Sequence, residues 1–249
     1  MAILAANWKL HKTTEDAVSW ARAVKASPLA RRCEVIVLPG FLQIPAVARE
    51  LHGSQIALGA QDVFWEESGA YTGMVAPTQL RDAGCAYALV AHSERRRLAG
   101  DDDRGANARI RAALACGLTP IYCVGEDEKE RSTGRFREAL VGQYDVGFEG
   151  LSAQEARRVI VAYEPIWAIG SGQPANPAQA AEIAGAIRDG VFARTGLESG
   201  LRILYGGSVA PENVAGYLGD TAMDGVLVGT ASLDPSEFLA MLEAVVDDG

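Results

Sequence analysis

The chain has 249 residues, 49% of them apolar, which is enough for one large hydrophobic core or two small ones. Its 23 Lys and Arg residues against 32 Asp and Glu residues give a formal net charge of −9. An acidic surface of this kind argues against nucleic acids and anionic membranes as partners, so any anion-binding site must be built locally.

The four cysteines form neither a metal-binding nor a disulfide pattern. None lies in a CxxC pair, and the closest two, Cys116 and Cys123, are separated by six residues. With only three histidines in the chain, we expect no metal site. No leader-like segment opens the chain, and no segment has the roughly 18 uninterrupted apolar residues of a membrane span. These features favour a cytoplasmic protein without disulfides.

Eight short apolar runs predict β-strands. Their continuous apolar character, without alternation, is typical of strands buried on both faces. The predicted strands are Ile3–Asn7, Val35–Leu38, Ile56–Ala60, Tyr87–Ala91, Pro120–Val124, Val159–Tyr163, Ile203–Tyr205 and Val226–Val228.

Helix-like patterns with periodic Ala, Leu and Val separate these runs. Pro177 and Pro235 stand early in two of them, where a missing N–H costs nothing, and Asn176 and Asp234 precede them as N-caps. Eight strand-then-helix units over about 250 residues predict one α/β domain, residues 1–249, folded as a (β/α)8 barrel of parallel strands surrounded by helices. A doubly wound open sheet is the alternative. The predicted helices include Glu15–Lys25, Ile44–Leu51, Ala106–Ala115, Arg135–Tyr144, Pro177–Arg194 and Pro235–Val246.

In such a barrel the active site lies at the carboxyl ends of the strands, so the residues that follow each strand test the prediction. Polar residues and glycines collect at these positions and predict a polar site there. They are Asn7-Trp8-Lys9, His92-Ser93-Glu94-Arg95-Arg96, Glu164, Gly206-Gly207-Ser208 and Gly229-Thr230.

Glu164 is the candidate general base. It stands between Tyr163 and Pro165-Ile166-Trp167, and apolar neighbours of this kind should strip its hydration and raise its pKa toward the range useful for a base. Pro165 and, further on, Gly170-Ser171-Gly172 give a stiff start and a flexible tip, as a hinged lid requires. We therefore expect a base and its water-excluding lid in one stretch.

Three more residues are candidates for a catalytic role, and each also has a non-catalytic interpretation. Lys9 could stabilise developing negative charge or be a solvated loop lysine, and Asn7 could donate from its amide or only form a turn. Ser93 could N-cap a helix that starts at Glu94. The helix dipole would then keep His92 neutral and able to donate a hydrogen bond, whereas the alternative is a satisfied core histidine.

The turns Gly206-Gly207-Ser208 and Gly229-Thr230 would expose backbone N–H groups where barrels of this kind usually bind phosphate. The first of these turns, together with other segments, resembles triosephosphate isomerases. Five motifs carry the resemblance, in the right order over the full chain, and five in register are highly specific. They are Asn7-Trp8-Lys9, Gly69-Ala70-Tyr71-Thr72-Gly73, Ala91-His92-Ser93-Glu94-Arg95-Arg96, Tyr163-Glu164-Pro165-Ile166-Trp167-Ala168-Ile169-Gly170 and Tyr205-Gly206-Gly207-Ser208.

The resemblance implies cofactor-free interconversion of D-glyceraldehyde 3-phosphate and dihydroxyacetone phosphate, a step of glycolysis and gluconeogenesis. This family is itself a standard example of tuned pKa values. Glu164 would move the proton between two carbons, neutral His92 would act at the two oxygens, and Lys9 and Asn7 would stabilise the enediolate. The phosphate would be held, largely through backbone N–H groups, by Gly170, Ser208, Gly229 and Thr230. The lid would comprise Pro165, Ile166, Trp167, Ala168, Ile169, Gly170, Ser171 and Gly172 and would exclude water from the site.

A homodimer is also implied. The Gln61–Met74 loop resembles the family's projecting loop, and Thr72 at its tip would touch the partner's Asn7 and the partner's Glu94. A solvated loop is the alternative, but three aromatic side chains in it are costly to leave exposed: Phe64, Trp65 and Tyr71.

Several positions differ from the family pattern, and none removes a catalytic side chain. Thr230 stands where a second glycine is usual, Met74 where a glutamate is usual, and Ala91 where a glycine precedes the histidine. Leu10-His11 replaces Met-Asn, and Gln173-Pro174-Ala175 lacks a frequent lysine. Two alternatives follow: an isomerase of a four-carbon ketose phosphate, or a non-catalytic barrel that binds a phosphorylated ligand. The intact catalytic set argues against the second.

Overall fold

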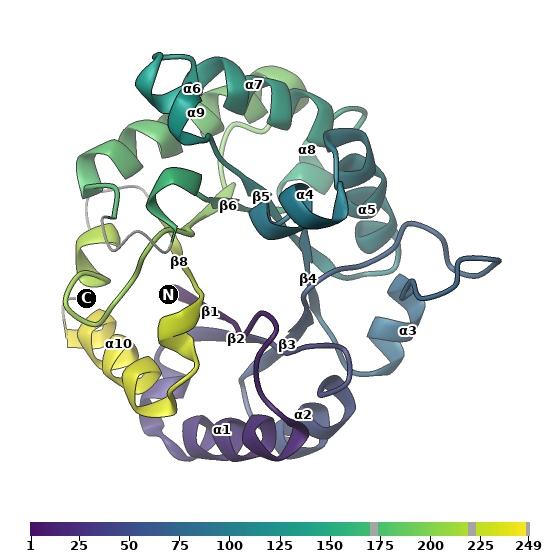
Figure 1. The fold of residues 1–249 in the computed structure, drawn as a ribbon, viewed down its shortest axis with the longest axis vertical. Coiled ribbons are helices and arrows are strands. Elements are labelled where there is room, and N and C mark those ends of the chain that lie inside the picture. The colour runs from purple at the N-terminus through teal and green to yellow at the C-terminus, as the bar shows by residue number, and fades with distance from the viewer. Residues whose placement is uncertain (170–173, 219–222, 248–249) are drawn as a thin grey trace.

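The computed structural model describes residues 1–169, 174–218 and 223–247. Eight parallel strands close into a barrel in sequence order, with β1 paired to both β2 and β8, and helices surround it (Figure 1). The predicted (β/α)8 barrel is confirmed, and the open-sheet alternative is wrong. The strands are β1 Ile3–Asn7, β2 Glu34–Leu38, β3 Ala57–Ala60, β4 Tyr87–Val90, β5 Thr119–Val124, β6 Ile160–Tyr163, β7 Arg202–Tyr205 and β8 Gly225–Val228.

The predicted strands are displaced by at most one residue at one end. The deviation at Ala91 has a structural cause: its φ of 55° is left-handed, so the chain leaves β4 one residue earlier than the apolar run suggests. This turn brings the next residue, His92, to the carboxyl end of the barrel.

All six predicted helices are present: α1 Thr14–Ala26, α2 Ile44–Leu51, α5 Asp103–Ala115, α7 Phe136–Gly147, α9 Pro177–Thr195 and α10 Pro235–Asp247. The predicted caps are confirmed, because Asn176 Oδ1 accepts from the amide of Gln179 at 2.8 Å and Asp234 Oδ1 from that of Ser236 at 2.7 Å. The helix expected to start at Glu94 is present as α4 Ser93–Ala99 and begins one residue earlier. The prediction missed the short helices α3 Pro77–Asp82, α6 Glu128–Ser132 and α8 Ala153–Ala156, and four 3₁₀ turns, η1 Pro28–Arg31, η2 Ile166–Ala168, η3 Ala215–Tyr217 and η4 Thr230–Ser232.

The strands are buried on both faces, as their apolar runs indicate. One apolar cluster fills the barrel interior and includes Ile36, Leu89, Ile121 and Leu204. A larger cluster lies between the strands and the helices. Two packed layers of this kind hold the strand ends in fixed positions, which is what a site assembled from several strands requires. Among the described residues, no helix is long and apolar enough to span a membrane.

Candidate active site

A cavity of about 350 Å³ opens at the carboxyl end of the barrel. It brings together seven of the residues that the sequence predicts, from β1, β4, β6, β7 and β8. They are Asn7, Lys9, His92, Glu164, Ser208, Gly229 and Thr230. The eighth predicted contact, Gly170, lies outside the described residues, as do Ser171, Gly172 and Gln173.

Lys9 is held in the left-handed region, with φ of 52°. Its backbone N–H donates to Asn7 Oδ1 at 3.0 Å, and Gln61 Nε2 donates to its carbonyl at 2.9 Å. The Lys9 ammonium lies 2.7 Å from Glu94 Oε1. A non-glycine residue in this conformation is strained, and these contacts over-determine it. They place a cation at the edge of the cavity.

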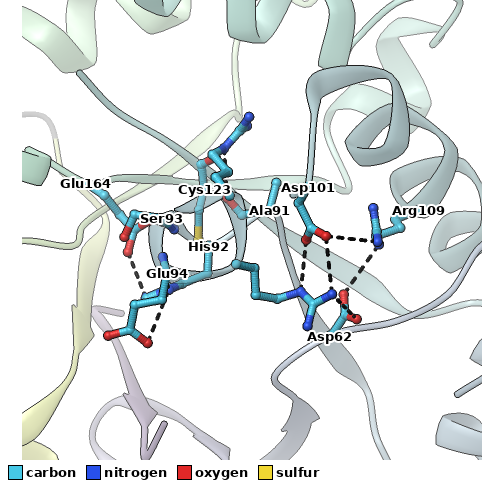
Figure 2. A network of polar contacts seen from close by, with 11 residues as sticks. Asp62, Ala91, His92, Ser93, Glu94, Asp101, Arg109, Cys123 and Glu164 are labelled. Atoms are coloured by element: carbon cyan, nitrogen blue, oxygen red, sulfur yellow. Dashed lines mark hydrogen bonds and ion pairs between the residues drawn. The ribbon is translucent and has the colours of Figure 1, made fainter. Parts of the chain in front are cut away.

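Glu164 and His92 form a buried pair. His92 Nε2 lies 2.9 Å from Glu164 Oε1, and Glu164 Oε2 accepts from the backbone N–H of Ser93 at 2.9 Å. Both side chains are almost fully buried. Figure 2 shows this pair with Glu94 beside it. A carboxylate within hydrogen-bond reach of an imidazole, on the wall of a cavity, is suited to acid–base chemistry.

The prediction that Ser93 is the N-cap of the helix after β4 is wrong. Helix α4 begins at Ser93, and His92 itself is the N-cap, because its Nδ1 accepts from the backbone N–H of Glu94 at 3.2 Å. An accepting Nδ1 carries no proton, so a neutral ring has its proton on Nε2, facing Glu164.

The predicted rise in the pKa of Glu164 is also wrong for this arrangement. Burial raises the pKa of Glu164, but the imidazole of His92 and the backbone N–H of Ser93 lower it by more. The apolar flanking residues gave no sign of these two polar partners. Burial lowers the pKa of His92, and the carboxylates of Glu164 and Glu94 raise it by more.

The first part of the predicted lid is held at the barrel by polar contacts. Residues Ile166–Ala168 form η2, and Trp167 Nε1 donates to Glu126 Oε1 at 2.9 Å. The Ala168 carbonyl accepts from Ser208 Oγ at 2.8 Å. At the far end, the Ala175 N–H donates to Tyr205 Oη at 2.9 Å.

Glu126 is a residue that the sequence analysis missed. It is fully buried, accepts from Tyr163 Oη at 3.0 Å as well as from Trp167, and lies two residues beyond the end of β5. Burial raises its pKa. Its position at a strand end was the available signal, and the same rule that selects Glu164 selects it.

The glycine turns lie at the opposite side of the cavity from α4. A Cβ added to Gly229 would stand 3.1 Å from Lys9 Cε, so glycine lets this turn approach the lysine closely. Thr230 follows, exposed, at the start of η4. The backbone of β8 thus reaches the cavity beside Lys9.

The segment between β3 and α3 projects from the barrel (Figure 1). Thr72 at its tip is exposed, and so, in large part, are Trp65, Tyr71 and Met74. Next to the active-site cavity lies a second one of about 440 Å³, whose lining includes the exposed Leu10 and Leu42 and the partly exposed Glu94. One apolar loop and one apolar hollow therefore lie on the same chain.

A second polar network, also missed, joins this loop to α4 (Figure 2). Arg95 lies 3.0 Å from Asp62 and 2.9 Å from Asp101, and Arg109 lies 3.1 Å from Asp101. Burial raises the pKa of Asp62, although the two arginines lower it. The network ties the helix that follows His92 to the root of the projecting loop.

Comparison with known proteins agrees with the fold. The family model described as triosephosphate isomerase matches residues 2–245. Relatives named triosephosphate isomerase include those of Pelobacter propionicus and Moorella thermoacetica, each 44% identical over 96% of this chain and 97% of the relative. That of Clostridium botulinum is 41% identical over 97% of this chain and 98% of its own length.

Fold and site together define a (β/α)8-barrel protein with a buried carboxylate–imidazole pair, a lysine and glycine turns around one cavity. The chain belongs to the triosephosphate isomerase family. In the described part of the chain, no group of three or more His, Cys, Asp or Glu residues could hold a metal ion.

Proposed function

We propose that this chain interconverts D-glyceraldehyde 3-phosphate and dihydroxyacetone phosphate, and the name of its relatives, triosephosphate isomerase, supports this proposal. The observation that carries the proposal is the Glu164–His92 pair at 2.9 Å on the wall of a cavity that Lys9 also lines. A carboxylate base, an imidazole donor and a cation are the groups that an enediolate mechanism needs.

In this mechanism Glu164 removes a proton from one carbon of the substrate and returns it to the next. Substrate entry separates Glu164 from His92. The Glu164 carboxylate, which raises the pKa of His92, is then no longer in contact with the ring. Burial, which lowers the pKa of His92, becomes the larger effect. His92 is therefore neutral during the reaction and donates from Nε2 to the substrate oxygens, as its accepting Nδ1 requires.

Lys9 and Asn7 stabilise the negative charge on the enediolate. Because Asn7 Oδ1 already accepts from the Lys9 backbone, its donor to substrate is Nδ2. Lys9 must exchange its contact with Glu94, which is half exposed, for one with the substrate. Such an exchange places the cation where charge develops.

The phosphate binds at Gly170, Ser208, Gly229 and Thr230, mainly through backbone N–H groups. Ser208 Oγ is engaged by the Ala168 carbonyl, so the lid residues Pro165–Gly172 change their contacts when Ser208 turns to the phosphate. Closure of the lid then excludes water from the reactive intermediate. No cofactor is required.

We also propose a homodimer in which the projecting loop of one copy occupies the 440 Å³ cavity of the other. Exposed Tyr71 and Met74 on the loop, and Leu10 and Leu42 at the cavity, support this arrangement. Thr72 would then reach the partner's Glu94. Sedimentation at micromolar concentration tests it: a dimer is expected, and a species that stays monomeric contradicts the docking.

The four cysteines are free, which supports a cytoplasmic location. There the isomerase would serve glycolysis and gluconeogenesis. A fractionation of cells that express the protein, with a cytoplasmic marker enzyme followed in parallel, tests the location.

The second candidate is an isomerase of a four-carbon ketose phosphate. Thr230 favours it, because a side chain at the phosphate turn changes the space between phosphate and base. The deciding experiment measures kcat/KM for glyceraldehyde 3-phosphate and for a tetrulose phosphate in one coupled assay. A triose value approaching about 10⁸ M⁻¹s⁻¹ supports the first function, since triosephosphate isomerase is a known case of diffusion-limited catalysis. A faster tetrulose supports the second, and no turnover of either leaves a phosphate-binding barrel.

A further inference from the structure

Lys12 ends the loop that carries Lys9, and its side chain crosses to another part of the barrel. Its Nζ donates to the carbonyl of Leu233 at 2.7 Å, across 221 residues of sequence, and lies 5.3 Å from the centre of the Trp8 ring. Leu233 directly follows η4, the turn that begins with Thr230. One lysine therefore links the loop after β1 to the segment after β8.

The loop after β1 must be held in place by contacts from other segments, because the backbones of two of its lysines are in the left-handed conformation. Lys9 has φ of 52° and Lys12 has φ of 72°. Residues in this region persist only where their surroundings impose the conformation. Gln61 Nε2 donates to the Lys9 carbonyl at 2.9 Å and Gln43 Nε2 donates to the Lys12 carbonyl at 3.0 Å, so the two backbones are tied to the segments that follow β3 and β2.

The far side of the link is fixed as well. Trp20 Nε1 donates to the carbonyl of Ser232 at 2.9 Å, and Ser232 Oγ donates to the carbonyl of Gly229 at 2.7 Å. The Ser232 carbonyl thus contacts α1, and the neighbouring Leu233 carbonyl contacts the loop after β1. Lys12 adds a cation to this carbonyl side, which is where a positive charge stabilises the peptide dipoles of a helical turn.

We propose that Lys12 is a positioning residue that fixes the Gly229–Thr230 turn relative to Lys9 and thereby sets how tightly a phosphorylated substrate binds. This rests on the proposed function. Lys12 does not itself line the active-site cavity, so it acts through the two segments that it joins. The turn and Lys9 are the groups that we assign to the phosphate and to the enediolate.

The test uses two variants at this position. Lys12→Gly removes the link while allowing φ of 72° without strain, so backbone strain does not contribute to any loss. Lys12→Arg keeps a cation that can reach a carbonyl. Kinetics on glyceraldehyde 3-phosphate and calorimetric titration with inorganic phosphate give two separate readouts, so binding is measured even where turnover is absent.

We expect Lys12→Gly to raise both KM and the phosphate dissociation constant about tenfold, with kcat within about twofold of wild type, and Lys12→Arg to restore most of the binding. A kcat loss at unchanged KM, or unchanged phosphate binding, overturns the proposal. Wild-type protein that binds phosphate but does not isomerise the triose refutes the proposed function and leaves this test intact. Wild-type protein that binds no phosphate refutes both.

The matched control is Lys25, whose Nζ also binds backbone carbonyls, those of Glu50 at 2.7 Å and His52 at 3.0 Å. It lies in the last turn of α1, away from the cavity-lining residues. Lys25→Met and Lys12→Met both remove a lysine–carbonyl contact. We expect only Lys12→Met to weaken phosphate binding, and equal weakening in both would reduce Lys12 to a general stabilising contact.

Discussion

The two ends of the barrel each hold a carboxylate among polar partners, and they differ in what those partners are. At the amino end, Glu34 begins β2 and accepts from Tyr87 Oη at 2.7 Å and from Arg202 Nη1 at 3.4 Å. Tyr87 and Arg202 begin β4 and β7. At the carboxyl end, Glu164 faces His92 at 2.9 Å and a cavity.

The two ends differ in whether the partners of the carboxylate can exchange a proton near neutral pH. Arginine stays protonated, and Tyr87, whose pKa is raised to about 12 by burial and by Glu34, keeps its proton as well, so the two partners of Glu34 exchange no proton near neutral pH. Imidazole can give or take a proton near neutral pH. The same type of residue thus stabilises one end of the barrel and is available for proton transfer at the other.

Replacing each carboxylate by its amide tests this contrast most strongly. Glu164→Gln keeps the shape but cannot accept a proton, so we expect kcat to fall by at least about 10³-fold while inorganic phosphate still binds. Glu34→Gln, the matched control, should leave kcat unchanged and cost about 1 kcal/mol of stability. A Glu164→Gln enzyme within tenfold of wild type would contradict the base assignment.

Lys9→Met tests whether the strained lysine contributes charge or only structure. Methionine keeps the apolar stem but removes the cation, so we expect kcat/KM for the triose to fall about 10²-fold, with both KM and kcat affected. The assay should be repeated at several salt concentrations. Kinetics equal to wild type would reduce Lys9 to a surface charge paired with Glu94.

Thr230→Gly tests the position in the predicted phosphate-binding turn where this chain has a threonine in place of the usual glycine. If the hydroxyl contributes to phosphate binding, its loss should raise KM for the triose about threefold to tenfold at unchanged kcat, and Thr230→Ser should behave as wild type. A lower KM in Thr230→Gly would mean that the side chain obstructs the triose phosphate, and it would favour the four-carbon substrate.

The sequence was sufficient for the barrel and for the residues that meet at its carboxyl end. Apolar runs place strands to within one residue, because burial on both faces leaves little choice of residue type. The strand-end rule then collects Asn7, Lys9, His92 and Glu164, which the structure brings together. Short helices such as α6 were missed, because five residues give too little periodicity to detect.

What the sequence could not give is the pairing of side chains across the site. The direction of the pKa shift of Glu164 depends on a backbone N–H and an imidazole 71 and 72 positions away, which no local pattern reveals. Likewise, the link from Lys12 to Leu233 joins the two ends of the chain. Such contacts follow from closure of the barrel.

The smallest predicted effect concerns the pH dependence of stability, measured as the free energy of unfolding of wild type minus that of Glu164→Gln. The lowered pKa of Glu164 means that its ionised form stabilises the fold above the unfolded-state value of about 4.3, a contribution lost as the pH falls through the folded-state pKa. The raised pKa of His92 adds stability below about 6.5 that is lost as the pH rises through its folded-state value.

The difference in free energy of unfolding should therefore be largest between about pH 4.3 and pH 6.5 and smaller on either side. Urea unfolding at a series of pH values and one protein concentration measures it. The contacts of Glu34, Tyr87 and Arg202 are common to both proteins and cancel. A difference that does not change with pH would mean that Glu164 and His92 titrate independently, and the carboxyl end would then hold no coupled pair to contrast with Tyr87 and Arg202, which keep their protons at the amino end.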